Sequence, residues 1–137
     1  MKVSAIYVNL PIKDVNRSRA FWTKLGFSIN EEFSDEKAIC LVLNEEKGLF
    51  AMLVTHEFFK TFTNRPISDG ITTQVINAIQ VENRETVDKI VKHALEAGAT
   101  RYREGKDEGW MYYDSFADLD GHQWEVMAMD VTKISPE

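Results

Sequence analysis

The fold is decided by V-N-L-P-I-K-D-V-N-R-S-R-A-F-W-T-K-L-G-F (Val8–Phe27), where a strand, a helix start and a helix stop follow one another. The largely apolar run Lys2–Leu10 stops at Pro11, which is typical of a strand that a proline ends. Asp14 is a residue type that caps helix N-termini, and Gly26 is the type that ends helices. The stretch therefore predicts one strand followed directly by one short helix.

The predicted helix has a single apolar face, because five of its residues recur at helical spacing. They are Val15, Ser18, Phe21, Trp22 and Leu25. Three strand-like runs follow, at 27–33, 37–43 and 49–55, and a turn at 44–48 precedes the last of them. The first half thus reads strand, helix, three strands.

The second half repeats this order. A strand at 73–81 precedes a helix that Asn83 caps and that ends at Gly98. The apolar face of this helix is formed by Val87, Ile90, Val91, Ala94 and Leu95. Three strands follow, near 100–103, 110–118 and 122–129. An internal repeat of this kind predicts two similar modules.

Between the repeats lies a connecting segment that begins with Phe58, Phe59 and Phe62 at helical spacing. It reads as a short helix followed by a linker, which Pro66 and the pair Asp69-Gly70 interrupt. We expect one domain over residues 1–137, with module 1 at about 1–56, the linker at about 57–72 and module 2 at about 73–130.

The composition excludes several classes of protein. The formal net charge of −6 and the lack of a basic stripe argue against nucleic acid as a partner. The single cysteine, Cys40, lies in an apolar run and predicts a buried thiol in a reducing compartment. The N-terminal apolar run is too short for a signal peptide, and no run reaches the ~20 residues of a membrane helix. We expect a cytoplasmic protein that does not bind membranes.

The stretch Val8–Phe27, the later stretch D-L-D-G-H-Q-W-E-V (Asp118–Val126) and the repeat together resemble the vicinal oxygen chelate superfamily. That superfamily includes glyoxalase I, the bleomycin and fosfomycin resistance proteins and the extradiol dioxygenases. The resemblance runs from Ile6 to Asp130. It implies an α+β fold in which two tandem βαβββ modules form a curved half-barrel cup. It specifies function poorly, because such folds support many chemistries.

The resemblance also implies four positions at which metal-binding members place their ligands. Carried over to this sequence, they fall on Tyr7, Met52, Ile76 and Glu125. Divalent metals prefer imidazole nitrogen or carboxylate oxygen, and only Glu125 supplies one of these. We therefore expect no cofactor and an incomplete metal site.

An alternative alignment leaves a metal site open. The shifted set Asn9, His56, Asn77 and Glu125 contains one histidine and one carboxylate. Such a set could hold Zn, Ni, Mn or Fe, with His56 and Glu125 as its stronger ligands. The role of Glu125 itself has three alternatives: a metal ligand, a carboxylate that contacts or transforms an organic ligand, or a structural residue.

Strand alternation predicts which side chains accompany Glu125. On the last strand Trp124, Val126 and Ala128 share a face suited to packing on a helix, and Glu125, Met127 and Met129 share the face assigned to the cup. The residues expected to contact a ligand, besides Glu125, are Tyr7, Asn9, Met52, Asn77, Trp110, Tyr113 and Met127. Methionines and aromatic rings on such a face favour an apolar or planar organic ligand. The segment 104–109 reads as a mobile loop at the edge of the cup.

Two classes of function follow. The first is a glyoxalase- or bleomycin-resistance-like protein that binds a small organic molecule without the full metal site. The second is a metal-dependent lyase, isomerase or dioxygenase of the glyoxalase type. Whether the protein is an enzyme stays open at this stage. The resemblance also implies a homodimer, which would suit the exposed edges that half-barrels leave.

Overall fold

The computed structural model describes residues 1–133. The chain divides into two compact units, Met1–Asp69 and a second that begins at Gly70. The division falls between Asp69 and Gly70, the pair predicted to interrupt the linker. No helix within residues 1–133 combines the length and the apolar character needed to cross a bilayer.

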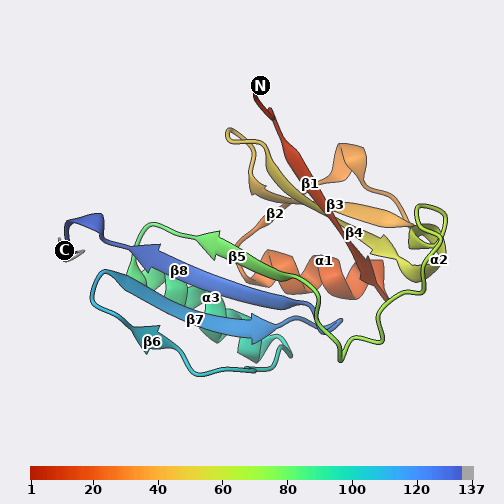
Figure 1. Ribbon diagram of the computed structural model, residues 1–137. Helices are drawn as coiled ribbons and strands as arrows, with labels where there is room; N and C mark the ends of the chain where they lie inside the picture. Colours follow the sequence, from red (N-terminus) through yellow and green to blue (C-terminus); the bar gives the residue numbers. More distant parts are fainter. Residues whose placement is uncertain (134–137) are drawn as a thin grey trace. The chain divides into compact units, whose positions relative to one another are not determined.

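The first unit contains a four-stranded sheet and one long helix (Figure 1). In chain order its elements are β1 (Ile6–Ile12), α1 (Val15–Lys24), β2 (Ser28–Asn30), the 3-10 helix η1 (Glu31–Phe33), β3 (Ala38–Asn44), β4 (Leu49–Thr55) and α2 (His56–Phe59). The strand order is β1-β4-β3-β2, with β1 parallel to β4 and the other pairs antiparallel.

The second unit repeats this topology. Its elements are β5 (Ile76–Gln80), α3 (Arg84–Glu96), β6 (Lys106–Asp107), β7 (Met111–Ala117), β8 (Gln123–Met129) and the 3-10 helix η2 (Val131–Lys133). The order is β5-β8-β7-β6, again with only the first pair parallel. The predicted α+β class with two βαβββ modules is confirmed, and both sheets are open rather than closed into barrels.

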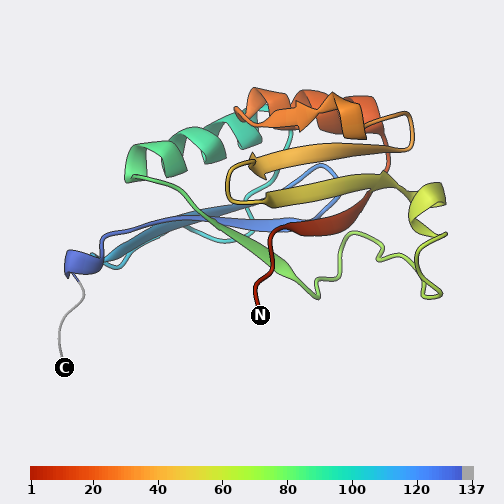
Figure 2. The ribbon, with the colours of Figure 1, turned by 90° about the horizontal axis from the view of Figure 1, so that it is seen from above.

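Both predicted helix starts are confirmed. The Asp14 carboxylate accepts a hydrogen bond from the Arg17 backbone N–H at 2.9 Å. The Asn83 side-chain oxygen accepts one from the Thr86 N–H at 2.8 Å. Each helix covers one face of the sheet in its own unit (Figure 2). The predicted apolar faces of α1 and α3 are buried, except for the half-buried Leu95.

Two glycines occupy equivalent places in the repeat, in the turn before the last strand of each module. Gly48 has φ +69°, and a Cβ there would lie 2.3 Å from the Ser4 carbonyl oxygen. Gly121 has φ +85°, and its Cβ would lie 2.1 Å from the Gly70 carbonyl oxygen. Both the backbone conformation and the close approach of a second backbone segment require glycine.

Two strands of the first module differ from their predictions by more than one residue. β1 begins at Ile6 rather than Lys2, and Pro11 lies inside it instead of ending it. A proline is tolerated there because β1 is an edge strand of its sheet. The strand predicted at 27–33 is also shorter, because residues 31–33 turn into η1.

The segment between α3 and β7 also differs from the prediction. Instead of a strand at 100–103 there is a single bridge, between Thr100 and Ala117. Instead of a loop at 104–109 there is the short strand β6, whose Asp107 forms an ion pair with Arg84. A Cβ on Gly105 would lie 2.8 Å from the Tyr113 carbonyl oxygen, so this segment runs close against β7.

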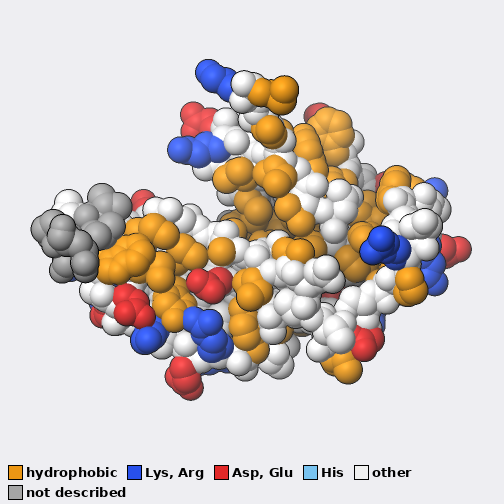
Figure 3. Space-filling view, viewed as in Figure 1, with side chains coloured by type: hydrophobic (Ala, Val, Ile, Leu, Met, Phe, Trp, Pro, Cys, Tyr) orange, Lys and Arg blue, Asp and Glu red, His pale blue; other side chains and the backbone are white. Residues whose placement is uncertain are grey.

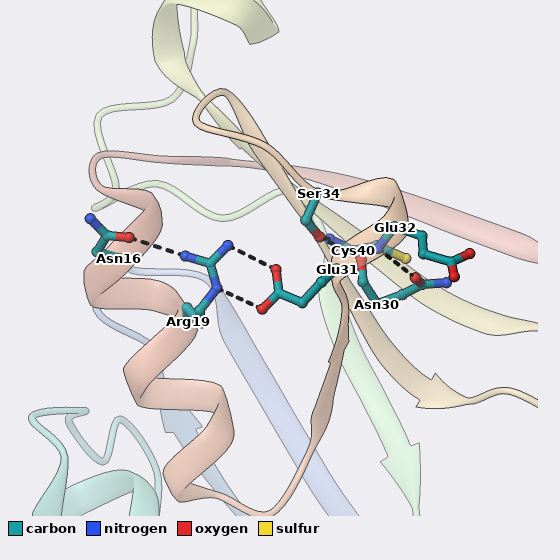
Figure 4. A network of polar contacts seen from close by, with 7 residues as sticks. All are labelled: Asn16, Arg19, Asn30, Glu31, Glu32, Ser34 and Cys40. Carbon is teal, nitrogen blue, oxygen red and sulfur yellow. Dashed lines mark hydrogen bonds and ion pairs between the residues drawn. The ribbon is translucent and has the colours of Figure 1, made fainter.

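A polar network holds the bend between β2 and β3 (Figure 4). Arg19 of α1 makes two hydrogen bonds of 3.1 Å to the Glu31 carboxylate. The Ser34 hydroxyl donates to the Asn30 carbonyl at 2.6 Å and accepts from the Cys40 backbone N–H at 3.0 Å. Cys40 is buried, as predicted, and burial raises the pKa of its thiol.

Candidate functional site

In the second unit one face of the sheet packs on α3 and the other does not. Trp124, Val126 and Ala128 are buried on the helix side, as predicted. Their neighbours Glu125, Met127 and Met129 point to the opposite side, which we call the open face of the second sheet. This face carries hydrophobic side chains over β7 and β8, with acidic and basic groups among them (Figure 3).

The strand register adds side chains of β7 to this open face. Ser115 lies opposite Glu125, and Tyr113 lies opposite Met127. Residues directly opposite in an antiparallel pair share a face. The structure therefore brings Glu125, Met127 and Tyr113, three of the predicted site residues, onto one surface.

The same register separates two other predicted residues from Glu125. Asn77 pairs with Trp124, and this places it on the helix side, whereas Ala78 lies beside Glu125. Trp110 lies two residues before Tyr112 and so shares its face, and Tyr112 pairs with Ala128 on the helix side. Asn77 and Trp110 therefore lie on the side of the sheet away from Glu125.

Two residues that the sequence did not single out, Tyr102 and Arg103, reach the open face. The Tyr102 hydroxyl contacts the Trp124 carbonyl at 3.5 Å. Burial raises the pKa of Tyr102, a hydrogen bond with Ser115 lowers it, and the charge of Glu125 raises it. Ser115 lies directly opposite Glu125, and the Tyr102 hydroxyl contacts the residue before Glu125, so both hydroxyls lie near the carboxylate.

Arg103 covers Tyr113. Its Nη2 donates to the Tyr113 hydroxyl at 2.5 Å, and its guanidinium lies 5.0 Å from the centre of the tyrosine ring. The Ser115 hydroxyl donates to the Arg103 carbonyl at 3.1 Å. Because the backbone at 100–105 is irregular, strand alternation could not predict these contacts.

The aspartate that precedes this site has a structural role. Asp118 is 9% exposed, and one carboxylate oxygen accepts from the N–H groups of Asp120 and His122, each at 3.0 Å. The other oxygen accepts from the Trp124 indole N–H at 3.0 Å. Burial raises the pKa of the Asp118 carboxyl, and its charged and hydrogen-bonding neighbours act against that rise. Asp118 thus shapes the turn from which Glu125 emerges.

Glu125 has no comparable partners. Within residues 1–133 its carboxylate forms no hydrogen bond and no ion pair, although it is only partly exposed. A partly buried carboxylate without a partner is unfavourable unless a ligand or water satisfies it. Glu125 is therefore the group on the open face with unused bonding capacity.

The first unit has an open face of its own. Tyr7 pairs with Phe50, and the two rings stack 4.8 Å apart at an angle of 10°. Asn9 pairs with Met52, and the Asn9 amide donates to the Tyr7 carbonyl at 3.1 Å. The three predicted residues Tyr7, Asn9 and Met52 thus share one surface, on which Tyr7 is 51% exposed.

Comparison with known proteins finds similarity in sequence over part of the chain and in fold over nearly all of it. The family model described as bleomycin resistance protein-like N-terminal matches residues 5–44, which contain β1, α1, β2, η1 and β3. A hypothetical protein from S. aureus superposes with TM-score 0.79 at 23% identity, covering 93% of this chain and 95% of its own. No curated protein sequence matches the chain.

Two further solved structures carry family descriptions. A glyoxalase/bleomycin resistance protein/dioxygenase family enzyme from Burkholderia phytofirmans PsJN has TM-score 0.71 and 21% identity, covering 90% of this chain and 96% of its own. A bleomycin resistance determinant encoded on transposon Tn5 has TM-score 0.64 and 18% identity, covering 93% and 99%. The chain has the fold of these proteins. The fold that the resemblance to the vicinal oxygen chelate superfamily implied is confirmed.

The residues of this chain do not fit the metal site that the resemblance implies. Of the four equivalent positions, Tyr7 and Met52 lie on the open face of the first sheet, and Ile76 and Glu125 on that of the second. Only Glu125 offers a donor that zinc, nickel, manganese or iron(II) prefers. Nor does any group of three or more His, Cys, Asp or Glu side chains within residues 1–133 have the arrangement of a metal site.

The shifted ligand set fits no better. Asn77 lies on the helix side of its sheet, so it cannot join Glu125 in ligating one ion. His56 begins α2 in the first unit, directly after β4. We derive no chemical step through a metal.

Proposed function

We propose that this chain binds a small organic molecule on the open face of its second sheet, without a bound metal. The observation that carries the proposal is Glu125, a carboxylate without a protein partner in the described chain, on a face that also presents Met127. The hydroxyls of Tyr102 and Ser115 lie near it. Such a site suits a ligand with an apolar or planar body and one group that donates a hydrogen bond or carries positive charge.

Each side chain of the site would have a distinct task. Met127 would contact the apolar body of the ligand, because a flexible thioether adapts to many shapes. Tyr113 is 7% exposed beneath Arg103, so it would contact the ligand only at its edge. Glu125 would accept the ligand's donor, and a hydrogen bond to a charged group is stronger than one between neutral groups. We include Tyr7, Asn9 and Met52 in the proposal as a second ligand-contacting surface, in the first module.

One of the similar structures supports a binding role. The Tn5 protein of the same fold is described as a bleomycin resistance determinant. We infer that the present chain likewise captures an organic compound rather than transforming one with a metal. We also propose that it forms a homodimer, because β1 and β5 are edge strands whose Ile6 and Ile76 are about half exposed.

The proposal predicts that binding depends on Glu125. A thermal-shift screen of small organic compounds, followed by calorimetry, should yield a ligand that Glu125→Gln binds roughly ten- to a hundredfold more weakly, as expected when a charged hydrogen-bond acceptor is lost. Met127→Ala should weaken binding less. Glu96→Gln, at the exposed end of α3, is the matched control and should bind as the wild type does.

Unchanged affinity in Glu125→Gln would contradict the proposal. A compound that the wild type consumes and Glu125→Gln only binds would instead favour an enzyme in which Glu125 acts as a base.

A further inference from the structure

A cavity that Glu125 does not line lies at the C-terminal end of β8. Its volume is about 380 Å³, within the range of small-molecule sites, and all of its lining residues belong to the second unit. Trp110, Tyr112 and Met129 contribute apolar surface, and Glu82, Arg84 and Lys133 contribute charge.

Two of these walls are fixed by their own contacts. The Tyr112 hydroxyl donates to Asp88 at 2.5 Å, and the Arg84 guanidinium lies 5.1 Å from the centre of the Tyr112 ring. Arg84 also binds both carboxylate oxygens of Asp107, at 2.5 and 2.8 Å. The polar groups of Tyr112 and Arg84 are therefore already engaged within the protein.

Trp110 differs from them. It is half-buried, yet its indole N–H has no acceptor and its ring has no aromatic or cationic partner within residues 1–133. The other two tryptophans, Trp22 and Trp124, are 2% and 1% exposed. Trp110 lines the cavity, and its N–H is a donor that no acceptor in the described residues occupies, so it is available to a bound molecule.

The charged side chains that line the cavity are balanced in number. Glu82 and Asp130 are acidic, and Arg84 and Lys133 are basic. A balanced lining gives no advantage to a charged ligand.

We propose that this cavity binds an uncharged, planar aromatic molecule whose ring nitrogen or carbonyl oxygen accepts a hydrogen bond from the Trp110 indole N–H. The ring body packs against Met129, whose sulfur makes favourable contacts with aromatic edges. Glu125 is not one of the residues that line this cavity.

Quinoline is a suitable probe, and naphthalene has the same shape without the acceptor. In ¹H–¹⁵N spectra of the full chain, quinoline should shift the Trp110 indole signal and the Gly109 amide saturably, and leave the indole signals of Trp22 and Trp124 unmoved. Naphthalene should bind about tenfold more weakly, since it accepts no hydrogen bond.

The variants separate this site from the open face. Trp110→Phe keeps a ring but removes the N–H, and it should weaken quinoline about tenfold, as followed by the Gly109 amide. Glu125→Gln changes a residue that does not line the cavity, so it should bind quinoline as the wild type does. The absence of a saturable shift at Trp110 and Gly109, or wild-type affinity in Trp110→Phe, would overturn the proposal.

Discussion

Gly121→Ala is expected to destabilise the protein by roughly 3 kcal/mol and to lower its melting temperature by about 10 °C. An alanine at φ +85° adopts a conformation that L-residues disfavour. Its Cβ would also lie 2.1 Å from the Gly70 carbonyl oxygen, a backbone atom that can move only if the segment before β5 moves. Urea unfolding followed by circular dichroism measures the change.

The chain offers a matched control for this prediction. Gly109 has nearly the same φ, +87°, but a Cβ there would meet no atom within 4 Å. Gly109→Ala should therefore show only the conformational cost, on the order of 1 kcal/mol. Equal losses in the two variants would mean that the contact with Gly70 does not constrain the turn.

The second large effect is expected at Asp118. Asp118→Ala removes the acceptor of three N–H groups in a buried turn and should cost roughly 3 kcal/mol of unfolding free energy. Asp118→Asn keeps only one acceptor oxygen. Its amide N–H2 group faces either the Trp124 indole N–H or the backbone N–H groups of Asp120 and His122, and neither can bond to it. The unfolding free energy of this variant should therefore lie between those of the wild type and Asp118→Ala.

Asp14→Ala serves as the comparison, because the Asp14 carboxylate accepts a single bond, at the exposed start of α1. Its expected cost is about 1 kcal/mol. Trp124 fluorescence in Asp118→Ala should also change, since the indole loses an acceptor at 3.0 Å. A cost no larger than that of Asp14→Ala would show that the turn does not depend on Asp118.

The parts of the fold that local chemistry determines could be predicted from the sequence. The caps Asp14 and Asn83 and the inner faces of both helices follow from side-chain type and spacing. The bounds of β4 were also predicted, because a turn with glycine precedes it. The place of Pro11 inside β1 could not be predicted. A strand tolerates proline at the edge of a sheet, and the edge position depends on which strands pair in the folded protein.

The site could be predicted only in part, because the pairing register of the strands cannot be read from the sequence to within one residue. One residue decides which face of a sheet a side chain occupies, so Ile76 shares a face with Glu125 and Asn77 does not. Tyr102 and Arg103 were missed because their backbone is not a regular strand, and alternation applies only to strands. Glu125 could be singled out because a lone carboxylate in an apolar strand is conspicuous in any register.

The central claim is that this chain has the vicinal oxygen chelate fold without the family's metal donors. The most direct test is metal content by mass spectrometry, on protein without a histidine tag dialysed against zinc, nickel, manganese or iron(II) and then against buffer. We predict that no metal is retained in stoichiometric amount, in the wild type or in Glu125→Gln. Retention of about one ion per chain by the wild type, lost in Glu125→Gln, would contradict the claim and indicate a metal site built around Glu125.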